Sequence, residues 1–312
     1  MSDTTTDRAG LGHNDDSRPG SSMMSASSAW PDASSWPEPK QAQTHLGTLE
    51  YHDIGDGPVI VFLHLIFADS SHWDDMVPLF ADRFRCILPT LPMGAHRVPA
   101  NTDADLSVAG LAKAVAELIE GLGASDVTLV GNDSGGAIAQ VVAANHPDVL
   151  DRVVLTNCDM YDTFPPKLFS YFKLLPYIPG GIAITARSLK IRAFWGLPFV
   201  FGYITNKVDG VKVDRWANAL LANKLCRRDA AKVIKGMGPD VTNKAAAALR
   251  TTKLPFLVAW GANDKAFKAS LAQRFCKEVP TATLVLIDDC KTLVCWDQPA
   301  RLAELISDFV PS

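Results

Sequence analysis

The chain has 312 residues, of which 47% are hydrophobic and 21% charged, and its formal net charge is −4. This composition allows one large α/β domain with an insertion, or two domains, around a sizeable core. The negative charge and the absence of a Lys/Arg cluster argue against a nucleic-acid partner, and no apolar run is long enough for an integral membrane segment. Six scattered cysteines without a CxxC motif are typical of reduced thiols in a cytoplasmic protein.

The N-terminal stretch is rich in Ser, Asp, Gly and Pro and shows no apolar period, so we expect residues 1–43 to be a disordered tail. It also lacks the charged start and apolar core of a signal peptide. Order is expected to begin with an alternating strand at residues 46–51. After a turn, the continuously apolar run 58–64 predicts a central strand covered on both faces.

Helices and strands then alternate along the chain. Helices are expected over residues 73–80, 107–122, 135–146, 270–278 and 299–309, and strands over residues 85–89, 127–133, 152–157, 255–261 and 282–287. This alternation predicts an α/β fold with right-handed crossovers and a mostly parallel, doubly covered sheet.

The alternation is interrupted over residues 159–252, which are helical in pattern, aromatic and broken by Pro and Gly. We expect a helical lid, or cap domain, inserted into a core formed by residues 44–158 and 253–312. Its aromatic residues suit the roof of an apolar pocket, although they would equally suit the lid's own core, and contact with a membrane surface is a third option. They are Phe164, Phe169, Tyr171, Phe172, Tyr177, Phe194, Trp195, Phe199, Phe201 and Tyr203.

One sharp turn separates a predicted strand from a predicted helix, and Asp133 stands at its tip. Gly131 and Gly135 leave room for strained backbone dihedrals at this position. A carboxylate held above the sheet edge, beside a helix N-terminus, is suited to nucleophilic attack. The alternative is an ordinary strand-to-helix turn in which Asp133 caps the helix.

Ligands of open α/β sheets bind beyond the carboxyl ends of the strands. The residues near those ends therefore include the candidates for chemistry. In chain order they are His64, Ile66, His96, Asp133, Asp159, Asp264 and Thr292.

These motifs resemble the α/β-hydrolase superfamily, specifically its aspartate-nucleophile branch of haloalkane dehalogenases and epoxide hydrolases. The resemblance covers about residues 46–310 and is most specific at Gly-Asn-Asp-Ser-Gly-Gly (131–136) and Trp-Gly-Ala-Asn-Asp (260–264). It implies an α/β-hydrolase fold in which Asp133 is the nucleophile of a nucleophile elbow. It also implies that Asp264 is the acid that orients a histidine, with Asp159 as the alternative acid.

The sequence departs from this family at the base. Counting back from Asp-Gln-Pro (297–299) places Thr292 at the family's histidine position, and no histidine follows His146. Hydrolysis of an aspartyl ester needs a deprotonated water, which a threonine cannot supply at neutral pH. Lys291 would serve only with a pKa depressed by burial. His96 is the candidate replacement base, and the alternative is a loop histidine with a packing role.

A second departure concerns the oxyanion hole, where the family's His-Gly pair is replaced by His64-Leu65. The backbone N–H groups of Ile66 and Ser134 are still expected to form the hole. The same two positions carry the halide-binding side chains of haloalkane dehalogenases, and neither Ile66 nor Ser134 matches those side chains. This argues against halide release.

The leading hypothesis is a hydrolase-type enzyme that acts on a small, largely apolar substrate through Asp133. One alternative is a catalytically degenerate protein of the same fold that binds a ligand or partner. Another is a lyase or isomerase that uses Asp133 as a general base. No metal-ligand spacing and no phosphate-binding Gly loop occurs, so we expect a small-molecule substrate and no cofactor or metal.

Overall fold

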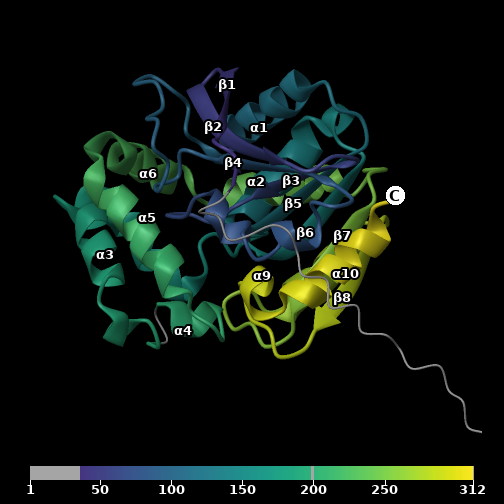
Figure 1. The fold of residues 1–312 in the computed structure, drawn as a ribbon. Coiled ribbons are helices and arrows are strands. Elements are labelled where there is room, and N and C mark those ends of the chain that lie inside the picture. The colour runs from purple at the N-terminus through teal and green to yellow at the C-terminus, as the bar shows by residue number, and fades with distance from the viewer. Residues whose placement is uncertain (1–35, 198–199, 312) are drawn as a thin grey trace, which may run out of the picture.

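A computed structural model describes residues 36–197 and 200–311. Its strands are Lys40–Thr44 (β1), Gly47–Ile54 (β2), Val59–Leu63 (β3), Arg85–Thr90 (β4), Val127–Asp133 (β5), Arg152–Cys158 (β6), Phe256–Gly261 (β7) and Ala282–Ile287 (β8). They form one eight-stranded sheet in the order β1-β2-β4-β3-β5-β6-β7-β8 (Figure 1). The pairs β1–β2 and β2–β4 are antiparallel and the other neighbours run parallel, which confirms the expected mostly parallel sheet.

Helices cover both faces of this sheet. The α-helices are Val108–Leu122 (α1), Ser134–Asn145 (α2), Gly181–Leu189 (α3), Phe201–Ile204 (α4), Gly210–Ala222 (α5), Lys224–Gly236 (α6), Pro239–Leu249 (α7), Ala269–Glu278 (α8), Val294–Asp297 (α9) and Pro299–Phe309 (α10). The central strand β3 divides its side chains between two apolar clusters: Val61 packs with residues of α1 and α2, and Phe62 packs with Trp73 and Leu302. Period-two alternation thus buries both faces of β3, as its continuously apolar sequence predicts.

The end of the predicted tail and the predicted helix at residues 73–80 differ from the sequence expectation. The predicted tail extends too far, because Lys40–Thr44 pairs with β2 as the edge strand β1; its mostly exposed side chains show no apolar period. Residues 1–35 of that tail lie outside the described residues, as does Phe199 of the lid. The predicted helix at 73–80 is instead two short 3-10 segments, Ser70–Trp73 (η2) and Val77–Leu79 (η3). Pro78 lacks the N–H that a continuous α-helix would use.

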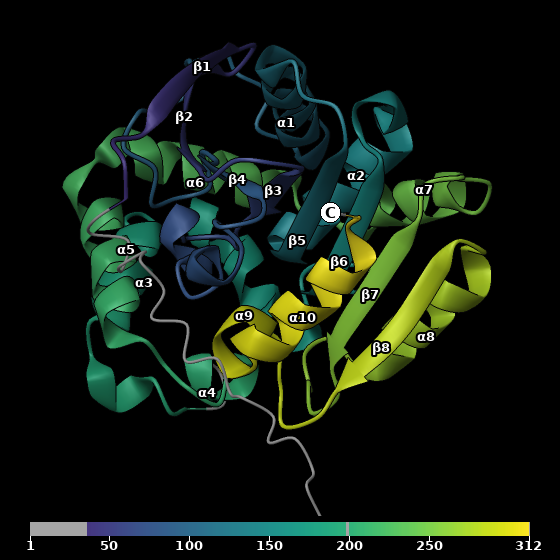
Figure 2. The same ribbon diagram turned by 45° about the vertical axis from the view of Figure 1, so that its right-hand side comes forward.

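The segment inserted between β6 and β7 is helical, as expected, but its parts lie in two places. Helices α3, α4, α5 and α6 group beside the strand ends (Figures 1 and 2). Helix α7 instead packs against α2 on the core, and Figure 2 shows it on the opposite side of the molecule from α3 and α5. The part of the insertion that covers the site therefore ends before α7.

All six cysteines are free thiols. Within residues 36–197 and 200–311, no helix combines the length and apolar character needed to cross a membrane.

Candidate active site

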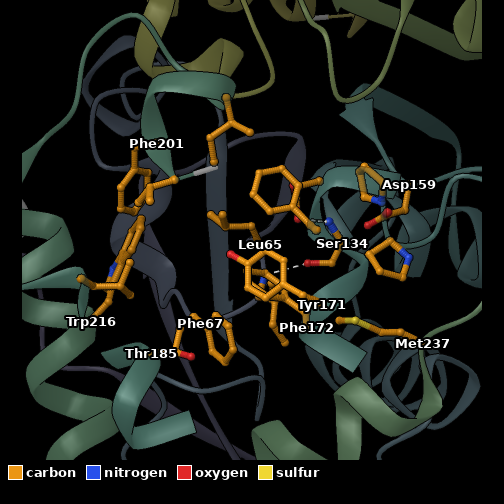
Figure 3. A pocket seen from close by; sticks show the side chains of 18 of the residues that line it. Leu65, Phe67, Ser134, Asp159, Tyr171, Phe172, Thr185, Phe201, Trp216 and Met237 are labelled. Atoms are coloured by element: carbon orange, nitrogen blue, oxygen red, sulfur yellow. Dashed lines mark hydrogen bonds between the residues drawn. The ribbon is translucent and has the colours of Figure 1, made fainter. Parts of the chain in front are cut away.

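A cavity of about 130 Å³ lies between the carboxyl ends of the strands and the helical insertion. Its polar lining includes Asp133, Ser134 and Asp159, and its roof is largely aromatic (Figure 3). The aromatic residues are Phe67, Phe169, Tyr171, Phe172, Phe201 and Trp216. Among the described residues that line the cavity there is no Lys, Arg or His, so its carboxyl groups meet no counter-charge from the lining.

The aromatic residues of the lid fall into three groups: some line the cavity, one is buried in the core, and others are exposed. Phe169, Tyr171, Phe172 and Phe201 line the cavity. Phe164 is instead buried in the apolar core beneath it. Tyr177 and Phe194 are exposed and do neither.

Asp133 adopts the backbone geometry of a sharp elbow. Its φ and ψ are 53° and −126°, and φ values in this region are uncommon for a residue with a side chain. The turn needs its glycines: a Cβ on Gly131 would lie 2.6 Å from the Gly135 carbonyl oxygen, and one on Gly135 would lie 2.3 Å from that of Leu63. The Asp133 side chain accepts from the N–H of the next residue, Ser134, at 2.7 Å. An ordinary N-cap accepts from the second or third helical N–H, so the geometry favours the elbow over the cap.

Burial decides the charge of this carboxyl group. Asp133 is partly buried in the apolar cavity, and desolvation raises its pKa to about 6. The hydrogen bonds from the backbone and side chain of Ser134 act in the opposite direction. Asp133 is therefore ionised at neutral pH, and its charge is poorly solvated.

The two expected oxyanion-hole donors lie beside Asp133 but differ in what they bind. The Ser134 N–H donates to Oδ1 of Asp133. The Ile66 N–H instead donates to the Ser134 hydroxyl oxygen at 2.7 Å. The Ser134 N–H therefore binds the Asp133 carboxylate, whereas the Ile66 N–H is occupied by the Ser134 side chain.

Asp264 and Thr292 are hydrogen-bonded directly to each other. The Thr292 hydroxyl donates to Oδ2 of Asp264 at 2.8 Å, and the side-chain amide of Asn157 donates to the same oxygen at 2.7 Å. Oδ1 of Asp264 accepts the backbone N–H groups of Ala266 and Phe267 at 2.7 and 3.1 Å. Burial raises the pKa of Asp264 to about 6 while these donors lower it. Neither Asp264 nor Thr292 lines the cavity.

His96 is not brought to Asp133. Its Nδ1 accepts the Gly94 N–H at 3.2 Å, and its Nε2 lies 3.2 Å from Oδ2 of Asp229 on α6. The ring is 3% exposed and borders a separate hollow with Thr44 and Leu46. The structure thus gives this histidine a fixed place between the core and α6, and it does not line the cavity that contains Asp133.

The other candidate bases are also engaged elsewhere. Nδ1 of His64 bonds the Leu65 carbonyl at 2.8 Å and its Nε2 accepts the Leu91 N–H at 2.9 Å, so the ring supports the loop. Burial lowers the pKa of His64 to about 4, which keeps it neutral. The Lys291 ammonium donates to two backbone carbonyls, those of Gly202 and Thr205.

Asp159 is the second carboxyl group of the cavity. It follows β6, is 3% exposed, and its Oδ1 is buried without a hydrogen-bond partner among the described residues. Desolvation and, to a smaller extent, the charge of Asp133 raise its pKa well above the ordinary range. The sequence marked Asp159 as the alternative acid that orients a histidine, but no histidine lines this cavity.

Sequence reasoning missed the wall supplied by α3, α5 and the end of α6. Thr185, Trp216 and Met237 line the cavity from these elements. The Trp216 indole N–H is fixed by Asp69 and the Ser71 hydroxyl, both at 3.0 Å. The apolar face of α5 carried a signal for burial, but nothing in the sequence indicated that Trp216 would face a cavity.

Comparisons with known proteins agree with this architecture. A family model described as "alpha/beta hydrolase fold" matches residues 58–299. The chain is 28% identical over 286 residues to haloalkane dehalogenase 2 of Mycobacterium tuberculosis (strain ATCC 25618 / H37Rv), a match covering 88% of this chain and 96% of the relative. It is 22% identical over 285 residues to a cis-3-alkyl-4-alkyloxetan-2-one decarboxylase of Shewanella oneidensis, covering 84% and 85% of the two chains.

A solved structure gives the same result for the fold. The crystal structure of an alpha/beta hydrolase fold protein from Burkholderia ambifaria matches with a TM-score of 0.71 at 17% identity, covering 86% of this chain and 97% of that chain. The fold class expected from the sequence is confirmed.

Proposed function

Since the chain belongs to the alpha/beta hydrolase fold family, we propose that this hydrolase-type enzyme attacks a small, largely apolar substrate with the Asp133 carboxylate. The observation that carries the proposal is the placement of Asp133. It lies on an elbow with φ of 53°, with Oδ1 held by the Ser134 N–H, at the polar floor of an aromatic cavity. The similarity to haloalkane dehalogenase 2 is consistent with an aspartate nucleophile.

The proposed first step is displacement at a substrate carbon. With Oδ1 held, Oδ2 of Asp133 is the attacking atom, and an ester to the Asp133 side chain forms as the leaving group departs. Poor solvation makes the carboxylate a stronger nucleophile than it would be in water. The apolar roof favours an apolar substrate, whose transfer from water releases about 25 cal/mol for each Å² that it buries.

The second step is attack of water on the ester carbonyl. The negative charge that develops on the carbonyl oxygen, Oδ1, is stabilised by the Ser134 N–H, which already contacts that atom. Ile66 would complete the hole if its N–H were released from the Ser134 hydroxyl.

A panel assay tests the proposal. The protein is incubated with haloalkanes, epoxides and esters, and product is measured together with the intact mass of the protein. We expect turnover or a covalent mass increase that maps to Asp133 and is absent in Asp133→Asn. If the parent gives neither on any panel member, or if Asp133→Asn behaves like the parent, the proposal is wrong.

The bond between Thr292 and Asp264 favours a second candidate, a ligand-binding protein with a decayed hydrolase site. A threonine there leaves Asp264 with no base to orient. Native mass spectrometry of the purified protein, followed by denaturation, distinguishes the two. A small molecule that leaves unchanged on denaturation, together with no turnover, supports the binder. Elimination or isomerisation of a substrate without an adduct would instead indicate that Asp133 is a general base.

A further inference from the structure

We infer that Asp159 is the acid–base residue of this site, which protonates the leaving oxygen when Asp133 attacks and then deprotonates the water that breaks the ester. The inference rests on the proposed role of Asp133 as nucleophile. It names the substrate class as well: a compound whose leaving atom is an alkoxide oxygen that needs a proton, such as a strained cyclic ether.

The first support is geometric. Asp133 ends β5, and Asp159 directly follows β6, the next strand of the sheet. Asp133 is aligned with Cys158 in the strand register, and the Asp159 N–H donates to the Asp133 carbonyl oxygen at 3.3 Å. Both side chains line the same cavity, and Figure 3 shows Asp159 beside Ser134 at the cavity wall.

The second support is an unused polar atom. Oδ1 of Asp159 is buried and has no hydrogen-bond partner within the described part of the chain. Such a group costs free energy in an apolar site unless a ligand or water satisfies it. Asp264, the other buried acid near the strand ends, provides the contrast, because four donors saturate its two oxygens. Asp264 is held in place, whereas Asp159 is available to a substrate.

The third support is charge. Two carboxylates facing one cavity without a counter-charge disfavour double ionisation, so one of them retains a proton. Burial raises the pKa of both acids, that of Asp133 to about 6 and that of Asp159 well above its ordinary range. The proton of such a pair is therefore assigned to Asp159, which is 3% exposed and has no donor to its Oδ1 among the described residues, while Asp133 carries the charge that the Ser134 N–H stabilises. These are the states that a nucleophile and a proton donor need.

The proton accounting closes over one cycle. Oδ2 of Asp133 attacks the substrate carbon, the carbon–oxygen bond of the ring breaks, and that oxygen takes the proton of Asp159. In the second step Asp159 takes a proton from water while the water oxygen adds to the ester carbonyl. The tetrahedral intermediate expels the substrate oxygen, which takes the remaining water proton. Asp133 returns as a carboxylate and Asp159 as an acid, and the net reaction adds one water.

A halide does not need this proton, and that difference provides the test. Styrene oxide and (2-bromoethyl)benzene share a carbon skeleton and differ in the leaving atom. Rapid quenching followed by intact mass and peptide mapping gives the rate of ester formation on Asp133 and the rate of its breakdown. The variant is Asp159→Asn, and the matched control is Asp162→Asn, the same chemical change at an exposed residue of the same segment. Melting temperature verifies that both fold.

In Asp159→Asn we expect ester formation from the epoxide to fall about 100-fold and that from the bromide to change little. With the bromide, Asp159 keeps its proton in the first step and releases it to solvent once esterification has removed the charge of Asp133. The bromide-derived ester should therefore persist in Asp159→Asn, because the group that would take a proton from water is missing. Asp162→Asn should match the parent, and Asp159→Glu, which keeps a carboxylic acid, should recover part of the epoxide reaction. If Asp159→Asn folds and keeps both parental rates, or loses both probes equally, the inference is wrong while the nucleophile proposal stands. If the parent itself forms no adduct on Asp133 with either probe, the nucleophile proposal fails and the inference with it.

Discussion

The Thr292 hydroxyl donates to Oδ2 of Asp264 at 2.8 Å, and both side chains are buried and lie outside the lining of the cavity that contains Asp133. A hydroxyl group thus occupies the side of Asp264 that would orient an imidazole. Because a threonine hydroxyl cannot accept a proton from water at neutral pH, the hydrogen bond between Thr292 and Asp264 has a structural role and does not supply a base.

Replacing Thr292 with histidine tests whether the rest of the site is competent. In Thr292→His we expect the imidazole to bond Asp264 and to accelerate breakdown of the Asp133 ester by about 100-fold, the usual range for a positioned base. Quenched-flow mass spectrometry measures this rate. Thr292→Gln, a large polar residue without a basic nitrogen, is the control. An ester that breaks down no faster in the histidine variant than in this control would show that the pocket is not arranged for hydrolysis.

Asp133 is expected to destabilise the fold when it is ionised. Its pKa is raised from 3.8 to about 6, so the folded state binds more protons than the unfolded state between those values. The stability contributed by the protonated form is complete below about pH 4 and is lost as the pH rises through about 6. Between pH 4 and pH 7, the free energy of unfolding of Asp133→Asn should therefore rise by about 2 kcal/mol relative to that of the parent.

Urea unfolding of the parent and of Asp133→Asn across this pH range checks the prediction. Asp162→Asn, which changes an exposed carboxyl group, should run parallel to the parent. A constant difference between Asp133→Asn and the parent would mean that burial does not perturb this carboxyl group.

Ser134→Ala should release the Ile66 N–H. The variant loses the bond from Ile66 to the Ser134 hydroxyl, at a cost of about 1 kcal/mol in the free energy of unfolding. The freed N–H becomes available to the charge that develops on Oδ1 of Asp133, so ester breakdown should become about tenfold faster. Ser170→Ala, which removes an exposed hydroxyl bonded to the Lys167 carbonyl, is the matched control. Slower breakdown in Ser134→Ala would show instead that the hydroxyl assists the reaction.

His96→Gln distinguishes a structural histidine from a base. The ring joins the Gly94 N–H to Asp229, and removing it leaves a buried carboxylate with one fewer partner. We expect about 3 kcal/mol lower stability, with the rates of ester formation and breakdown unchanged well below the melting temperature. A variant with parental stability that accumulates the ester would identify His96 as the base after all.

The elements that sequence could predict are those with a strong local pattern. Apolar runs located the central strands, Ser107 marked the start of α1, and Gly131 and Gly135 marked the elbow at Asp133. The edge strand β1 was missed because its exposed side chains carry no period.

The chemistry of the site depended on long-range packing, which a local pattern does not encode. Whether His96 turned toward Asp133 or toward Asp229 was decided by α6, more than one hundred residues away along the chain. Likewise, the sequence placed Asp159 at a strand end. Only the folded structure shows that its Oδ1 is buried and has no hydrogen-bond partner among residues 36–197 and 200–311.

The central claim is that Asp133 forms an ester which water then breaks at the carbonyl carbon. A single turnover in ¹⁸O-labelled water, with enzyme in excess over an epoxide substrate, tests it most directly. The account predicts that the label enters the Asp133 carboxylate, where one ¹⁸O in place of ¹⁶O raises the mass of the peptide by about 2 Da. The product of the first turnover should carry no label. Labelled product from an unlabelled Asp133 would contradict it, because water would then have attacked the substrate itself.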